Sequence, residues 1–76
     1  MRVTAQFRMV RAPGAPEGEL ALDLPEDSQV NSVLAAAGLR NQEPNLLFVI
    51  DGRAVDPEAR LREGDLLLIL PRLSGG

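Results

Sequence analysis

Several of the side chains that commonly carry out catalysis are missing from this sequence. Histidine, cysteine, tyrosine, tryptophan and lysine are absent from its 76 residues. Ser28, Ser32 and Ser74 therefore have no histidine or lysine that could activate them as nucleophiles. The eleven acidic residues could act in pairs as acid and base, but they are scattered through turns and polar strand faces. We do not expect catalysis by this chain alone.

The C-terminus offers a different kind of reactive group. The sequence ends in Ser74, Gly75 and Gly76, shortly after the apolar run 66–70. Two glycines have no side chains and are free in φ and ψ, so their backbone can pass through a narrow channel. Such a pair ends roughly one chain in 200 by chance, and a frayed end or a cloning remnant is the alternative. The α-carboxylate of Gly76 is the candidate reactive group.

Composition excludes several classes of function. All eight basic residues are arginines, they are spread out, and the net charge is −3. Nucleic-acid binding would need a basic stripe and stacking rings, so a protein partner with a basic docking face is favoured. No apolar run is long enough to span a membrane, and the absence of cysteine removes disulfides and thiolate metal sites. We expect a cytoplasmic protein without a metal site.

The first half of the sequence predicts two strands and a helix. Residues 2–10 alternate apolar and polar side chains and predict a strand. The residues on its apolar side are Val3, Ala5, Phe7 and Met9. A turn-rich loop over 12–18 precedes a second strand, whose apolar residues are Leu20, Leu22 and Leu24. Asp27 or Ser28 is placed to cap a helix that ends at Gly38.

The second half predicts the rest of a small sheet. Residues 46–50 form a third strand, and Asp51-Gly52 turns the chain into a short fourth strand at 53–55. Residues 56–61 could form a turn of helix, and a Gly-Asp turn leads into the last strand at 66–70. This ββαβ(β)β order predicts an α+β domain with one helix across one sheet face. Its expected core comprises Phe7, Leu22, Val33, Leu34, Phe48, Leu67 and Ile69.

The third and last strands carry more apolar side chains than one short helix can cover. One of their two faces must therefore be exposed or be covered by another segment, such as the long loop. One face comprises Leu47, Val49, Leu66, Leu68 and Leu70. Alternation alone does not say which face is exposed. We favour an exposed apolar patch near the C-terminus, because such patches mark docking surfaces.

Small size, this element order, the turn Glu63-Gly64-Asp65 and the terminal Gly75-Gly76 resemble the ubiquitin-like β-grasp sulfur carriers of the MoaD/ThiS family. The segments 61–65 and 70–76 look most like the small subunit of molybdopterin synthase. Arg72 and Leu73 differ from that subunit, which has proline and valine there. The resemblance implies a mixed four- to five-stranded sheet over residues 1–70 and a flexible tail over residues 71–76.

The resemblance also implies how the tail is used. A ubiquitin-activating-type enzyme would adenylate Gly76 with ATP, and a sulfur donor would convert it to a thiocarboxylate. The residues that would thread the tail into a partner are Pro71, Arg72, Leu73, Ser74 and Gly75. Pro71 would end the ladder of the last strand, and Arg72 either pairs with an acidic partner residue or is an ordinary solvated arginine. The docking patch implied by the ubiquitin resemblance comprises Leu47, Val49, Leu68 and Leu70.

Several functions fit this resemblance. The first is a non-catalytic sulfur carrier for molybdopterin synthesis, with no bound cofactor and with the large synthase subunit as a partner. The second is a protein modifier that Gly76 joins to lysines of targets. Sulfur carriage for tRNA thiolation or thiamine synthesis is a variant of the first, and a plain interaction domain is the third.

Overall fold

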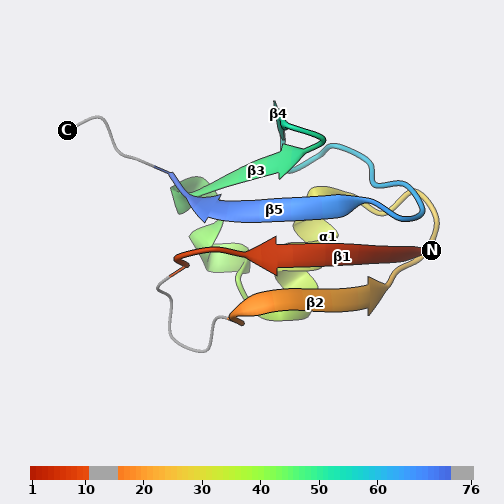
Figure 1. The fold of residues 1–76 in the computed structure, drawn as a ribbon, viewed down its shortest axis with the longest axis horizontal. Helices are drawn as coiled ribbons and strands as arrows, with labels where there is room; N and C mark the ends of the chain where they lie inside the picture. Colours follow the sequence, from red (N-terminus) through yellow and green to blue (C-terminus); the bar gives the residue numbers. More distant parts are fainter. Residues whose placement is uncertain (11–15, 73–76) are drawn as a thin grey trace.

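The computed structural model describes residues 1–10 and 16–72, in which five strands form one sheet with a helix behind it (Figure 1). The spatial order of the strands is β2-β1-β5-β3-β4. Their bounds are β1 Arg2–Phe7, β2 Gly18–Asp23, β3 Leu46–Ile50, β4 Arg53–Val55 and β5 Leu66–Pro71. The sheet is mixed, and the one α-helix within the described residues lies on one of its faces. The predicted α+β fold class is therefore confirmed.

The first and last strands pair at the centre of the sheet. β1 and β5 run parallel, with Thr4 opposite Leu66 and Phe7 opposite Ile69. The remaining neighbours, β1–β2, β3–β4 and β3–β5, are antiparallel. The β3–β4 hairpin is closed by Asp51 (φ 52°) and Gly52 (φ 77°), and this pair of positive φ angles defines the tight turn that an Asp-Gly pair favours.

Strand β1 is shorter than the alternation over residues 2–10 predicts. It ends at Phe7, although the backbone N–H of Arg8 still donates to Ile69 O at 3.0 Å. Met9 has a φ of 60° and its side chain is 74% exposed. A positive φ breaks the extended backbone, so the prediction that the strand continues through Met9 is wrong.

The helix α1 spans Val30–Ala37, and its expected end is confirmed. Gly38 has a φ of 74° and its N–H donates to carbonyls of the last turn. The predicted capping by Asp27 or Ser28 is wrong, because the N-cap is Gln29 and no side chain caps the helix. The N–H groups of Val30 and Asn31 have no acceptor within the helix. They donate instead to backbone carbonyls of a loop distant in the sequence, Ala59 O and Pro57 O respectively, both at 2.9 Å.

That loop is not the helical turn expected over residues 56–61. It forms a backbone turn, with the N–H of Ala59 donating to Asp56 O, and Arg60 then makes a β-bridge with Gln29. A short 3₁₀ helix, η1, spans Arg40–Asn45 between α1 and β3. The loop thus contacts the start of α1, and η1 follows its end.

The core lies between α1 and the sheet. Six of the seven predicted core residues are buried, while Leu22 is only partly buried because β2 is an edge strand. Among the described residues, those that are buried are Val3, Ala5, Phe7, Val30, Val33, Leu34, Leu39, Leu46, Phe48, Leu61, Leu67 and Ile69. The core therefore extends beyond the predicted set by six residues: Val3, Ala5, Val30, Leu39, Leu46 and Leu61.

Candidate functional site

The structure decides which face of β3 and β5 is buried. Phe48, Leu67 and Ile69 point to the helix and are at most 1% exposed. Their neighbours of opposite parity lie on the outer face, the sheet face turned away from α1. We call these residues the outer patch: Leu47, Val49, Leu66, Leu68 and Leu70. Leu66 is 48% exposed and the other four are half-buried.

The residues of the outer patch are side by side because of the strand register. Leu70 is opposite Leu47 and Leu68 is opposite Val49 across the β3–β5 pair. Ala54 on β4 continues the second of these rows. A shallow hollow of about 250 Å³ lies over Leu66 and Leu68 beside the β3–β4 turn. The patch is therefore one continuous apolar surface.

The other half of the outer face is polar. Thr4 and Gln6 on β1 lie next to Leu66 and Leu68. Beyond them, Arg2 pairs with Asp23 through two hydrogen bonds, from Nε to Oδ1 at 3.1 Å and from Nη2 to Oδ2 at 3.0 Å. Hydrogen bonding and the charge of Arg2 lower the pKa of Asp23, and the same contacts raise the pKa of Arg2. The outer face thus divides into an apolar half and a polar half.

Strand β5 continues through Pro71, so the expectation that Pro71 ends the ladder is wrong. Pro71 pairs with Leu46, and the N–H of Arg72 donates to Asn45 O at 2.7 Å. Alternate residues of a strand direct their backbone groups to opposite sides. The missing N–H of Pro71 therefore belongs on the β1 side, where β1 has already ended, and no ladder bond is lost.

The candidate tail begins at an exposed point of this strand. Pro71 and Arg72 are both exposed, and Arg72 takes no part in the ion pairs of the described residues, which are Arg2–Asp23 and the N-terminal amine with Glu26. Leu73, Ser74, Gly75 and Gly76 lie outside the described residues. The structure thus brings the four residues expected to form the docking patch together, two on β3 and two on β5, the strand that leads to the tail.

The described residues contain neither a candidate metal centre nor a candidate membrane span. Within residues 1–10 and 16–72, no group of three or more acidic side chains is arranged to hold a metal ion. In the same part of the chain, no helix is both long and apolar enough to cross a membrane.

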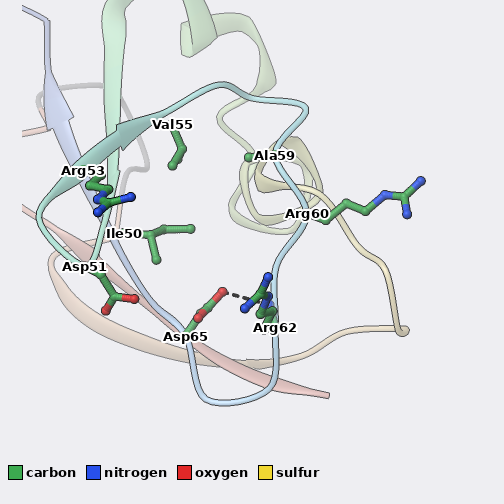
Figure 2. Close-up of a pocket in the computed structure, with 8 residues that line it drawn as sticks. All are labelled: Ile50, Asp51, Arg53, Val55, Ala59, Arg60, Arg62 and Asp65. Atoms are coloured by element: carbon green, nitrogen blue, oxygen red, sulfur yellow. Dashed lines mark hydrogen bonds between the residues drawn. The ribbon is translucent and has the colours of Figure 1, made fainter.

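A second hollow was not predicted from the sequence. It measures about 470 Å³ and lies between the β3–β4 hairpin and the loop 59–65 (Figure 2). Arg53 from the hairpin and Arg62 from the loop line it together with Asp51 and Asp65. Sequence patterns could not predict it, because it forms only where the fold brings two separate turns close together.

Comparison with known proteins agrees with this architecture. The model of the ThiS family matches residues 2–76, and the chain therefore belongs to the ThiS family. A search of curated protein sequences found no match. The described fold is a ubiquitin-like β-grasp fold, as its likeness to solved ubiquitin-like structures shows.

Three solved structures illustrate the range of relatives. SAMP1 from Haloferax volcanii has a TM-score of 0.74 and 20% identity, with 100% of both chains covered. The complex of subunits 1 and 2 of molybdopterin-converting factor from Helicobacter pylori matches with a TM-score of 0.65 and 20% identity, again over 100% of both chains. Ubiquitin from Caldiarchaeum subterraneum matches with a TM-score of 0.64 and 17% identity, over 100% of this chain and 98% of that one.

Proposed function

We propose that this chain is a sulfur carrier for molybdopterin synthesis, in which the carboxylate of Gly76 is activated and converted to a thiocarboxylate. The observation that carries the proposal is the match to the ThiS family, which extends over residues 2–76 and so includes the terminal Gly75-Gly76. The outer patch supports it, because β5 carries three leucines of that patch and leads towards the tail.

The proposed chemistry has two steps. A carboxylate oxygen of Gly76 attacks the α-phosphorus of ATP, pyrophosphate leaves, and an acyl-adenylate forms. A sulfide nucleophile from the sulfur donor then attacks the carbonyl carbon, AMP leaves, and the product is a thiocarboxylate. The activating partner supplies the nucleotide site, the Mg²⁺ and the stabilisation of the oxyanion, so the carrier itself needs no cofactor.

The carrier supplies a docking surface and a thin tether. Leu47, Val49, Leu68 and Leu70 are the proposed contacts for a ubiquitin-activating-type adenylating enzyme. The segment 71–76 can extend about 20 Å at roughly 3.3 Å per residue, enough to reach a recessed active site. Gly75 keeps the tether narrow, and Arg72 is free to meet an acidic group at the channel mouth.

The proposed partner of the sulfur-loaded carrier is the large subunit of molybdopterin synthase. The Helicobacter pylori relative was solved as a complex of the two subunits of molybdopterin-converting factor. By analogy, this chain would be the non-catalytic small subunit of such an assembly. Because ATP is consumed by the activating partner, we place the protein in the cytoplasm.

A protein modifier is the second candidate, and one observation favours it. The likeness to SAMP1, a small archaeal modifier protein, has a TM-score of 0.74. In that case Gly76 would form an isopeptide bond with a lysine of the target. This sequence contains no lysine, so chains built through lysines of the protein itself are excluded while single attachment is allowed.

Intact-mass spectrometry tests the proposal directly. The chain is incubated with ATP, the adenylating enzyme from the same source and sulfide. We expect a mass increase equal to the replacement of one oxygen by sulfur, localised to Gly76 by fragmentation. An unchanged mass in a reaction that consumes ATP would overturn sulfur carriage. Conjugates of target proteins that disappear when Gly76 is deleted would establish the modifier instead.

A further inference from the structure

The arginine-lined hollow beside β4 is separate from the outer patch. By register, Arg53 and Val55 lie on the same face of the sheet as Ile50 and Phe48, which is the face that carries the core. The hollow therefore opens on the helix-covered side, whereas the outer patch lies on the opposite side. We propose that this hollow binds an extended acidic segment of a partner protein.

Two arginines at the hollow can attract an anion although the protein is acidic. The lining holds Arg53, Arg60 and Arg62 together with Asp51 and Asp65; without Arg60 these charges balance, whereas the chain as a whole carries −3. Figure 2 shows the guanidinium groups of Arg53 and Arg62 beside the hollow, while Arg60 extends away from it. The ion pairs of the described residues do not include Arg53 or Arg62. Both guanidinium groups are exposed and able to receive carboxylates.

One of the two aspartates is already engaged. A side-chain oxygen of Asp65 accepts the backbone N–H of Arg62 at 2.8 Å. This bond stabilises the turn that carries Arg62, so Asp65 has a structural role at the hollow. Asp51 belongs to the tight turn of the hairpin. It lies at the edge of the hollow and also lines the shallow hollow of the outer face.

The rest of the lining suits a peptide better than a nucleotide. The apolar residues of the hollow are Ile50, Val55 and Ala59, all partly buried. None of the described lining residues is aromatic, so a base has no ring on which to stack. An open hollow of about 470 Å³ with apolar and cationic groups accepts alternating aliphatic and acidic side chains.

The edge of the sheet supports an extended conformation for this segment. β4 is one of the two edge strands of the sheet. Ile50 and Arg53 flank the two-residue turn and form a hydrogen-bonded pair, so the next residue, Ala54, directs its N–H and C=O away from β3. A partner strand can pair with these two groups while its side chains reach the hollow. The acidic side chains would then meet Arg53 and Arg62.

Nuclear magnetic resonance titration of the full chain tests this inference. The probe is a short synthetic peptide of alternating glutamate and valine, compared with a peptide in which glutamine replaces glutamate. We expect the acidic peptide to shift the amide signals of Arg53, Ala54, Ala59 and Arg62, and the glutamine peptide to bind at least about tenfold more weakly. Absence of these shifts at millimolar peptide would overturn the proposal.

Charge-reversal variants give the matched control. The double variant Arg53→Glu/Arg62→Glu is expected to weaken peptide binding by at least about tenfold. Arg40→Glu, on η1, makes the same kind of charge change outside the hollow and should alter binding less than about twofold. Equal losses in both variants would show non-specific attraction and contradict the assignment, as would full competition by inorganic phosphate. Sulfur transfer to Gly76 is measured in a separate assay, so a failure of peptide binding at the hollow can be told apart from a failure of the sulfur-carrier proposal.

Discussion

Gly75 is the residue at which the proposed tether is most easily tested. Valine at this position adds a branched side chain and restricts φ. We expect Gly75→Val to abolish conversion to the thiocarboxylate, as measured by intact mass, while the melting temperature changes by less than about 3 °C. The buried residues that the structure describes end at Ile69, so a large fall in melting temperature would contradict the tether model.

The ion pair of Arg2 with Asp23 predicts a small dependence of stability on pH. Because Asp23 has a lowered pKa in the folded protein, its contribution is present above the ordinary carboxyl pKa of about 4 and is lost as the pH falls through the lowered value. Both groups are exposed, so salt should weaken the effect.

Urea unfolding at pH 7 and pH 3 in low salt measures this contribution. We expect Asp23→Asn to lose stability at pH 7 and to show a smaller decrease between the two pH values than the parent chain. Glu58→Gln is the control, because Glu58 is exposed and takes no part in the ion pairs of the described residues. Identical pH profiles for Asp23→Asn and the parent would refute the linkage.

At the level of elements, one face of β5 contributes to the core and the other carries the proposed docking surface. Leu67 is completely buried, and Leu67→Ala is expected to cost about 3 kcal/mol and lower the melting temperature by more than roughly 10 °C. Leu68 is half-buried on the outer face, so Leu68→Ala should cost less than about 1.5 kcal/mol.

The order of the two variants should be reversed for docking: Leu68→Ala should impair it more than Leu67→Ala. Thermal unfolding monitored by circular dichroism gives the stability of both variants. ATP-dependent adenylation by the partner enzyme, at a temperature where both are folded, gives the docking effect. We expect a raised KM for Leu68→Ala and little change for folded Leu67→Ala. Equal KM values for the parent and Leu68→Ala would remove Leu68 from the proposed docking surface.

The start of α1 depends on its neighbouring loop. Because Ala59 O and Pro57 O accept the first two N–H groups of the helix, the N-cap side chain contributes little. We expect Gln29→Ala to cost less than about 1 kcal/mol in urea unfolding. Replacing Pro57 or Ala59 cannot remove a carbonyl, so deletion of Glu58 is the contrasting variant, and it should destabilise more than Gln29→Ala.

Elements with a strong local signal were predicted from the sequence, and elements set by distant contacts were not. The strand 46–50 and its Asp51-Gly52 turn follow from apolar runs and turn chemistry. The helix cap was mispredicted because the carbonyls come from another segment. Pro71 was mispredicted because its tolerance depends on where β1 ends. In the site, alternation identified two candidate faces, and only the tertiary fold decided between them.

For the molecule as a whole, the central position of β5 predicts how truncations behave. A chain that ends at Asp65 lacks Leu67 and Ile69 and loses the strand that joins the β1–β2 hairpin to the β3–β4 hairpin. We expect it to be unfolded by circular dichroism. A chain that ends at Arg72 keeps the bond from Arg72 N to Asn45 O and should melt within about 3 °C of the parent. A folded shorter chain would contradict the central role of β5.

The two proposed docking surfaces lie on opposite sides of this sheet. The outer patch covers β3 and β5 on the face away from α1, and the arginine-lined hollow opens on the other side beside β4. A partner on the hollow would therefore leave most of the outer patch accessible. The sequence suggested only the first surface, because Arg53 lies on β4 and Arg62 lies nine residues later, in the loop that joins β4 to β5.

The insertion of β5 between β1 and β3 also has a consequence during protein synthesis. The hairpins β1–β2 and β3–β4 emerge from the ribosome first, but they share no sheet until β5 arrives. That strand brings the long-range contacts on which slow folding steps depend, and it brings three leucines of the outer patch. A nascent or prematurely terminated chain thus displays no complete recognition surface, so an activating enzyme that reads the patch would commit ATP only to finished molecules.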